Sequence, residues 1–361
     1  MNDIDYMKLA LELAKSTQGQ TSPNPMVGSV VVKDGAIVGV GAHLKAGEGH
    51  AEVQALKMAG EKAKDGTIYV TLEPCSHYGK TPPCADLIIE KGLKRVVVAT
   101  GDSNPAVAGR GLTRIKEAGL EVKFGVCQQE ANELNEIFFH FMKYQKPYVT
   151  LKSATTLDGK TATVTGKSKW ITGEEAREDV HRYRHTHDAI LVGIGTVLAD
   201  NPSLTTRLPN GGKNPIRVVL DRSLRIPVEA KLVQDQEAPT WILTTEEASM
   251  DKQKELEKYG IDVLRTPDGS IEKVLPLLGT KGITSLFVEG GAEVNGSFLR
   301  ARAVDQVITY MAPKLFGGQM APTAIGGKGI EEVENALELE IKEVTTIGKD
   351  IKIVSRVRRS E

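Results

Sequence analysis

The chain has 361 residues, of which 40% are hydrophobic and 26% are charged, which predicts two or three folded domains and excludes a mainly disordered protein. Lysine and arginine (46) balance aspartate and glutamate (47), so the overall charge disfavours a nucleic-acid partner. Three cysteines exclude a disulfide scaffold and favour a reducing compartment.

The first predicted element is an amphipathic helix in residues 1–15, with apolar side chains at Ile4, Met7 and Leu11. This segment lacks the basic head and apolar run of a secretory signal. Nor does any stretch approach the roughly 18–20 apolar residues that a membrane span requires. We therefore expect a cytoplasmic protein without a membrane partner.

A β-hairpin follows in residues 27–41, because two Val-rich runs flank the turn residues Asp34 and Gly35. Beyond it, helical and strand patterns alternate, which is typical of a layered α/β domain. The predicted helices are residues 50–64, 84–91, 111–119 and 128–143, and the predicted strands are residues 67–72, 95–100 and 120–126.

Pro147 ends the last of these helical patterns, and we place a domain boundary near residues 144–147. The expected domains are residues 1–146 and 147–361. Helical patterns separate several strands of the second domain, so it is also predicted to be α/β. Its predicted strands are residues 148–156, 189–195, 216–221, 240–245, 261–266, 285–291, 306–313 and 350–357.

The first domain contains a candidate zinc site formed by His50, Cys75 and Cys84, each of which we place at the start of a helix. Helix N-termini favour anions and so lower the pKa of a thiol. Zinc binds such a mixture of nitrogen and sulfur in a tetrahedron. Three protein ligands leave one position for water, whose pKa the metal lowers towards ~7.

Glu52 is the candidate proton carrier for this site. It lies two residues from His50 and so points in another direction on a helix, where it can reach the water and a substrate nitrogen. The pattern H-x-E followed by P-C and a second Cys is typical of zinc deaminases. Eight residues separate Cys75 from Cys84, however, where nucleobase deaminases have two. A structural zinc site with His77 or Cys127 as fourth ligand, or no metal at all, is the alternative.

The second domain contains two glycine-bearing strand ends that suit a nucleotide. Residues 193–196 end one predicted strand, and residues 289–297 end another and lead into a helix, whose N-terminus favours a pyrophosphate. The alternative is a pair of ordinary turns. No G-x-G-x-x-G motif follows a strand, which disfavours a standard Rossmann domain.

Several longer runs resemble the bifunctional riboflavin-biosynthesis deaminase/reductases, collinearly over nearly the whole chain. The runs are SPNPMVGSVVV, HAEVQAL, YVTLEPCSHYGKTPPCADLI and GDSNP in the first half, and LKSATTLDGKTAT, SKWITG, ILVGIGTVLADNPSLTTR and FVEGG in the second. The eight-residue spacing is part of that family's pattern. The resemblance implies a cytidine-deaminase-like three-layer domain followed by a dihydrofolate-reductase-like α/β domain, with one zinc ion (Zn2+) and NADPH as cofactors.

The same resemblance implies two successive reactions on a small phosphorylated pyrimidine. The first domain would hydrolyse the 2-amino group of 2,5-diamino-6-(5-phosphoribosylamino)pyrimidin-4-one. The second would use NADPH to reduce the ribosyl side chain to ribityl. We also expect the chain to be a homo-oligomer.

The resemblance also assigns binding residues, which we list by role. Asn24, Lys80, Asp102 and Asn104 would line the deaminase pocket. Lys152, Ala154, Trp170, Thr196, Asp200 and the loop Gly291, Ala292, Glu293, Val294, Asn295, Gly296 and Ser297 would contact NADPH. Ser168, Arg184, Leu204, Arg207 and Glu289 would contact the reductase substrate. Arg184 and Arg207 suit a grip on its phosphate, Lys152 and Asp200 are candidate proton donors, and Trp170 either stacks near the nicotinamide or packs in the core.

Two other functions are compatible with these residues. One is a single-function deaminase of free bases or nucleosides, with a non-catalytic nucleotide-binding second domain. The other is a nucleotide-binding regulator held together by structural zinc. His181 and His185 have the spacing of a helical metal pair, but Arg182 stands where a metalloprotease needs Glu.

Overall fold

The computed structural model describes residues 1–76, 82–102 and 109–358. The chain forms two compact units, Met1–Gln145 and Lys146–Glu361, which are described separately below. In the described residues, no helix is both long and apolar enough to span a bilayer.

The first unit is built on one mixed five-stranded sheet. Its strands are β1 (Gly28–Lys33), β2 (Ala36–Ala42), β3 (Thr67–Leu72), β4 (Arg95–Thr100) and β5 (Glu121–Phe124). The spatial order is β2-β1-β3-β4-β5. β1 is antiparallel to β2 and β3, whereas β4 is parallel to β3 and β5. The carboxyl ends of β3 and β4 therefore lie at the same edge of the sheet.

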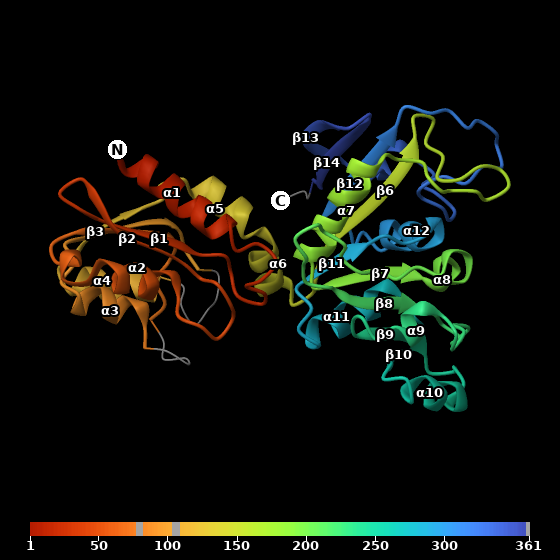
Figure 1. Cartoon of the computed structure of the whole chain (residues 1–361), viewed down its shortest axis with the longest axis horizontal. Helices are drawn as coiled ribbons and strands as arrows, with labels where there is room; N and C mark the ends of the chain where they lie inside the picture. The colour runs from red at the N-terminus through yellow and green to blue at the C-terminus, as the bar shows by residue number, and fades with distance from the viewer. Residues whose placement is uncertain (77–81, 103–108, 359–361) are drawn as a thin grey trace. The chain divides into compact units, whose positions relative to one another are not determined.

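Helices cover both faces of this sheet and give the unit three layers (Figure 1). Val31 of β1 packs in the core beneath α2 (Ala51–Ala59), α3 (Cys84–Glu90) and α4 (Arg110–Glu117). Its neighbour Val30 packs on the other face, beneath α1 (Asp3–Lys15) and α5 (Gln128–Leu134). This alternation is expected of a strand that is buried on both faces.

The Asp34-Gly35 turn predicted from the sequence is confirmed, and the structure adds a cap at the start of α1. Asp34 and Gly35 form the β1–β2 turn with φ values of 49° and 78°, the left-handed conformation that a tight hairpin requires. The Asn2 side chain caps α1 and forms a capping box with Asp5. The helix expected over residues 128–143 is instead divided into α5 and α6 (Glu136–Tyr144). The break is at Asn135, whose buried amide bonds the backbone N–H and carbonyl of Met26.

α2 rests directly on β2 because β2 carries glycines where the helix crosses it. A Cβ added at Gly41 would lie 2.3 Å from the Ala51 carbonyl oxygen, and one at Gly39 would lie 2.1 Å from the Ala55 carbonyl oxygen. Neither distance is compatible with a side chain unless the helix moves. Since His50 and Glu52 stand at the start of α2, this contact sets their position above the sheet.

The second unit is built on a nine-stranded sheet in the order β10-β9-β8-β7-β11-β6-β12-β14-β13. Its strands are β6 (Tyr148–Thr156), β7 (Ala189–Gly193), β8 (Ile216–Leu220), β9 (Thr240–Thr245), β10 (Asp262–Thr266), β11 (Ser285–Val288), β12 (Gln306–Ala312), β13 (Leu339–Ile347) and β14 (Asp350–Val357). The seven strands from β10 to β12 are parallel, and β14 and β13 continue the sheet as an antiparallel hairpin.

Helices cover both faces of this sheet as well. Ile190 and Val192 of β7 pack on the face of α7 (Glu174–Thr186), α8 (Ile194–Asp200), α9 (Lys231–Gln234) and α10 (Met250–Glu257). Ala189 and Leu191 pack on the opposite face, with α11 (Ile271–Thr280) and α12 (Ala292–Arg300). The hydrophobic run of β7 is therefore that of a central parallel strand.

Sequence patterns missed parts of this unit. β13 was not expected, because most of its side chains are exposed and it lacks the apolar run of a buried strand. β7 and β11 are shorter than predicted, since the chain turns into α8 at Ile194 and reaches α12 soon after Val288. Residues 193–196 and 289–297 are thus helix beginnings rather than ordinary turns, with Gly193 and Gly291 as the N-cap residues.

Candidate functional sites

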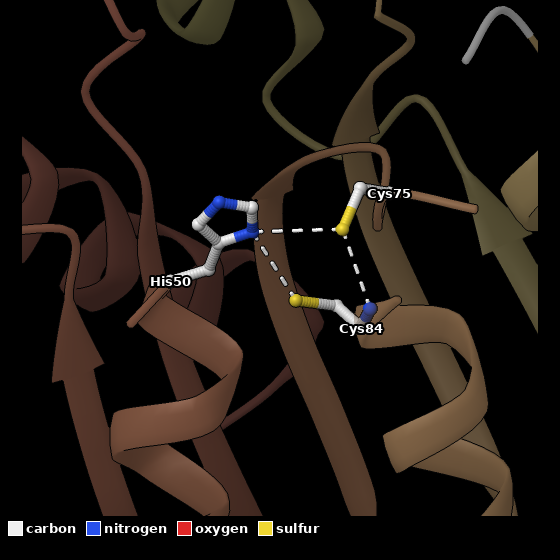
Figure 2. A group of neighbouring side chains, drawn as sticks. All are labelled: His50, Cys75 and Cys84. Carbon is white, nitrogen blue, oxygen red and sulfur yellow. Dashed lines mark hydrogen bonds between the residues drawn. The ribbon is translucent and has the colours of Figure 1, made fainter. Parts of the chain in front are cut away.

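The first unit brings His50, Cys75 and Cys84 together, with their ligand atoms all within 4.8 Å of one another (Figure 2). His50 Nδ1 lies 3.5 Å from Cys75 Sγ and 3.3 Å from Cys84 Sγ. Tetrahedral zinc, with bonds of about 2.1 Å to nitrogen and 2.3 Å to sulfur, separates such atoms by about 3.6 Å. The three donor atoms therefore have the chemistry and the spacing of a zinc site.

The positions of these residues differ in one respect from the sequence prediction. His50 is the N-cap of α2 and Cys84 is the first residue of α3, as expected, but Cys75 lies in the loop after β3. Its sulfur still reaches the start of α3, where the Cys84 backbone N–H donates a hydrogen bond to Cys75 Sγ over 3.3 Å. The N-terminus of α3 therefore favours the thiolate form of Cys75, although Cys75 is not part of the helix.

Ionisation of the two thiols is coupled because the sulfurs face each other. A hydrogen bond from Cys84, opposed by burial and reinforced by His50, lowers the pKa of Cys75 to about 4. The hydrogen bond to the Cys75 sulfur, together with burial and Glu52, raises the pKa of Cys84. A divalent cation between the sulfurs would allow both to ionise, which again fits zinc.

Glu52 lies beside this cluster and is 3% exposed. Burial raises its pKa to about 7, against the lowering effect of His50. A carboxyl group with such a pKa can both accept and release a proton near neutral pH. Cys127, the alternative fourth ligand, packs with the core of α1 and α5 on the other face of the sheet. The other alternative, His77, lies outside the described residues.

Among the expected binding residues of this unit, Asn24 and Asp102 are described, whereas Lys80 and Asn104 lie outside the described residues. Asp102 comes two residues after β4, at the sheet edge that also carries Cys75. No partner of His43 could be predicted from the sequence. The Asn24 amide nitrogen lies 3.0 Å from His43 Nε2, and the buried His43 ring stands edge-on to His50.

The second unit contains a cavity of about 1080 Å³. Most of the residues expected to bind cofactor or substrate line it: Lys152, Ala154, Ser168, Trp170, Arg184, Thr196, Asp200, Leu204, Arg207, Glu289, Gly291, Ala292 and Asn295. Those that do not are Glu293, Val294, Gly296 and Ser297. They belong to α12: Val294 packs against the core, and a Cβ at Gly296 would lie 2.2 Å from the Gly326 carbonyl oxygen.

An ion cluster stands at the centre of the expected binding residues. Arg184 Nε and Nη2 donate to the two carboxylate oxygens of Glu289 at 2.6 and 3.1 Å, and Lys152 Nζ lies 3.5 Å from Glu289. Burial alone would raise the pKa of Glu289, but Arg184 and Lys152 outweigh it and hold the pKa at about 2. Glu289 is therefore a carboxylate at every physiological pH.

The expected phosphate grip of two arginines is altered by this cluster. Arg184 is already bidentate on Glu289, and its third nitrogen donates to the Thr205 carbonyl oxygen over 3.0 Å. Arg207 also lines the cavity, with Thr205 Oγ1 as the hydrogen-bond acceptor of its guanidinium, 3.3 Å away. Arg207 is consequently the arginine more open to a phosphate.

Two further expectations concern histidine and tryptophan. His181 and His185 are not a metal pair, because their Nδ1 atoms accept the backbone N–H groups of Arg207 and Lys213. Trp170 does not pack in the core, since it is 64% exposed and lines the cavity.

Sequence reasoning missed three cations that line the same cavity, Lys169, Arg177 and Lys231. Lys169 forms an ion pair with Asp200, 3.6 Å away, and the Arg177 guanidinium lies 4.5 Å from the centre of the Trp170 ring. None of the three belongs to a strand end, which was the signal used for this half of the chain. Three additional positively charged side chains in the cavity suit a ligand that carries phosphates.

Known proteins resemble both units. Residues 1–100 match the family model of the cytidine and deoxycytidylate deaminase zinc-binding region, and residues 147–353 match that of the RibD C-terminal domain. The riboflavin biosynthesis protein RibD of Bacillus amyloliquefaciens is 54% identical over 97% of this chain and 95% of its own length. Its counterpart from Aquifex aeolicus is 48% identical over 97% of each chain.

Solved structures resemble the whole chain. RibD of Acinetobacter baumannii superimposes with a TM-score of 0.90 at 39% identity, over 99% of each chain. A diaminohydroxyphosphoribosylaminopyrimidine deaminase/5-amino-6-(5-phosphoribosylamino)uracil reductase of Thermotoga maritima does so with a TM-score of 0.88 at 38% identity, again over 99% of each chain.

These similarities confirm the predicted pair of folds and the two cofactors, zinc and NADPH. They also decide against a single-function deaminase and a non-catalytic regulator, since both halves match bifunctional relatives along their length. The chain belongs to the RibD family, the riboflavin-biosynthesis enzymes that combine a zinc-dependent deaminase with a reductase in one polypeptide.

Proposed function

We propose that the first unit removes the 2-amino group of 2,5-diamino-6-(5-phosphoribosylamino)pyrimidin-4-one as ammonia, and that the second reduces the ribosyl side chain of the product to ribityl. The observation that carries this proposal is the buried carboxyl group of Glu52 beside three converging zinc ligands. The name of the Thermotoga maritima relative specifies the same pair of reactions.

For the deaminase, we assign the ligands to His50, Cys75 and Cys84, and the proton transfers to Glu52. When bound, zinc supplies a water acidic enough to act as a nucleophile near neutral pH. Glu52 accepts a proton from the attacking water and passes it to the ring nitrogen. It then accepts the second proton, from the hydroxyl group now on the ring carbon, and passes it to the amino group, which leaves as ammonia while the carbonyl forms. Asn24, Asp102, Lys80 and Asn104 bind the substrate.

For the reductase, NADPH supplies a hydride to C1 of the open ribosyl chain. The helix beginnings at Thr196 and Gly291 would hold the cofactor, because backbone N–H groups at a helix N-terminus favour phosphates. Arg207 binds the substrate phosphate, and the carboxylate of Glu289 accepts hydrogen bonds from the ribosyl hydroxyls. We assign the proton donor to Lys152, which lines the cavity beside the buried Glu289, rather than to Asp200, which is half-exposed and pairs with Lys169.

Turnover of the diaminopyrimidine with and without NADPH tests both assignments. We expect ammonia release in either case, and loss of NADPH absorbance only after deamination. Ammonia release without any later NADPH oxidation would refute the reductase assignment. NADPH oxidation by the original diaminopyrimidine would refute the proposed order.

The remaining assignments concern the whole chain. Residues 1–146 form the deaminase domain and residues 147–361 the reductase domain. The protein is cytoplasmic, acts on small molecules without a nucleic-acid or membrane partner, and is a homo-oligomer. Exposed apolar side chains on the edge strand β13, Ile341 and Val344, support self-association, which light scattering of the purified protein tests.

A further inference from the structure

Positively charged side chains donate hydrogen bonds to the backbone of one wall of the cavity in the second unit. Lys314 Nζ donates hydrogen bonds to the carbonyl oxygens of Trp170, at 2.8 Å, and Ile171, at 2.6 Å. Arg177 Nη1 donates to the carbonyl oxygen of Thr172 over 2.8 Å. Three successive carbonyl groups of the wall therefore each accept a hydrogen bond from a cation, and such bonds are stronger than neutral ones.

The segment of residues 170–173 is also held at Gly173 and at the Trp170 side chain. The backbone N–H of Gly173 donates to Asp350 Oδ2 over 2.5 Å. The Arg177 guanidinium lies over the Trp170 indole, 4.5 Å from the ring centre. Since the indole is 64% exposed, packing does little to hold it, and these charged contacts set its position.

Lys314 and Arg177 are available for this role because neither has a competing ion pair in the part of the chain that the structure describes. Within the described residues, no carboxylate lies within salt-bridge distance of either cation. Lys314 is separated from Trp170 by 144 positions in the sequence, so the contact joins two loops that only the fold brings together.

We propose that Lys314 and Arg177 are positioning residues of the reductase, which hold Trp170 in the wall of the cavity against bound NADPH. This inference rests on the proposed function, in which the cavity binds the cofactor. Neither residue transfers a proton or a hydride. They hold the wall in place before the cofactor binds, and so lower the entropy cost of binding.

The test compares Lys314→Met, which removes both hydrogen bonds at similar length, with Lys314→Arg, which can still donate to two carbonyls. Lys258→Met, an exposed lysine at the end of α10, is the matched control. Each is made in a Trp241→Phe background, so that Trp170, the other of the two tryptophans, is the only indole. Fluorescence anisotropy of the ligand-free protein reports the mobility of Trp170.

We expect Lys314→Met to lower this anisotropy and to raise KM for NADPH about tenfold, with kcat changed less than about threefold, because binding rather than chemistry is impaired. Lys314→Arg should restore most of both values, and Lys258→Met should alter neither. Deaminase activity of the same samples should stay constant, which shows that the first unit is intact, and the retained reductase kcat shows that the second unit is folded.

We call the contacts of Lys314 and Arg177 with residues 170–172 the clamp. Unchanged anisotropy in Lys314→Met would refute the proposal that the clamp holds Trp170. Lower anisotropy with an unchanged KM would refute its role in cofactor binding. Should Lys314→Met not fold, Arg177→Gln tests the other half of the clamp with the same two measurements. If the parent protein does not oxidise NADPH at all, the proposed reductase function fails, while the anisotropy still decides whether the clamp holds Trp170.

Discussion

At the scale of single residues, a substitution at Glu52 should affect deamination and leave reduction unchanged. Glu52→Gln keeps the size of the side chain but removes its ability to accept a proton. We expect deamination to fall by about 10²–10⁴-fold, the usual contribution of a general acid–base group. Ammonia release measures this change, and the zinc content should remain that of the parent protein.

The control for Glu52→Gln is the other active site of the same chain. Reduction of the deaminated product should proceed at the parental rate. Ammonia release at the normal rate would mean that another group carries the proton.

Arg184 allows a prediction about pH. Glu289 has a folded-state pKa of about 2, below its ordinary value, so its ionisation stabilises the folded protein above about pH 4.5 and this contribution is lost as the pH falls towards 2. Arg184 lowers the pKa of Glu289 more than Lys152 does, so replacing Arg184 with Gln raises this pKa. The acid limb of reductase kcat/KM should then move to higher pH.

A pH profile of Arg184→Gln beside the parent protein checks this shift. Arg182→Gln is the matched control, since Arg182 lies on the exposed side of α7 and pairs only with Glu178 among the described residues. An acid limb at the same pH in both variants would show that Glu289 does not control the reductase.

At the scale of secondary structure elements, the glycines of β2 matter to the zinc site. Gly41→Ala would place a methyl group 2.3 Å from the Ala51 carbonyl oxygen and so push the start of α2 away from the sheet. His50 and Glu52 would move with the helix. We expect weaker zinc binding and a fall in deamination of at least tenfold, since a shift of about 1 Å can cost two orders of magnitude in rate.

Zinc affinity measured by competition with a chelator, together with ammonia release, tests this effect. Gly35→Ala is a useful comparison, because a Cβ there meets no atom within 4 Å although its φ of 78° is unfavourable for alanine. Any destabilisation from that change is therefore unrelated to α2. Equal zinc affinity in Gly41→Ala and the parent protein would contradict the prediction.

Most elements could be predicted from the sequence because they depend on local patterns. Continuous apolar runs indicated β3, β4 and β7, and the Asp34-Gly35 turn indicated the first hairpin. β13 could not be predicted, since its exposed side chains carry no such pattern and it is held by pairing with β14. The break at Asn135 was also invisible, because it depends on contacts with Met26, far away in the sequence.

The clustering of His50, Cys75 and Cys84 could be predicted because their residue types and spacing form a motif. Contacts between distant residues could not be. The pairing of Arg184 with Glu289, the position of His43 beside Asn24, and the reach of Lys314 to Trp170 each join segments whose proximity only the fold establishes.

At the scale of the whole molecule, the two active sites should respond separately to removal of zinc. All three proposed zinc ligands belong to the first unit, and every residue that lines the large cavity belongs to the second. Dialysis against a chelator should therefore abolish ammonia release and lower the thermal stability of the deaminase unit, because metal binding stabilises the folded state. Reduction of the deaminated product should continue.

Calorimetry and the two activity assays, before and after zinc is restored, measure these effects. Recovery of deamination on adding zinc is the control for irreversible damage. Loss of both activities on chelation would show that the reductase also depends on the metal.

The continuity of the chain from Gln145 to Lys146 has a consequence for metabolism. Because a single translation product contains both catalysts, a cell makes them in equal numbers and cannot adjust one without the other. At given substrate and NADPH concentrations, accumulation of the intermediate therefore depends on the kinetic constants of the two sites and not on their relative amounts. A substitution that slows the later step would raise the intermediate's steady-state level, and changes in gene expression could not correct that imbalance.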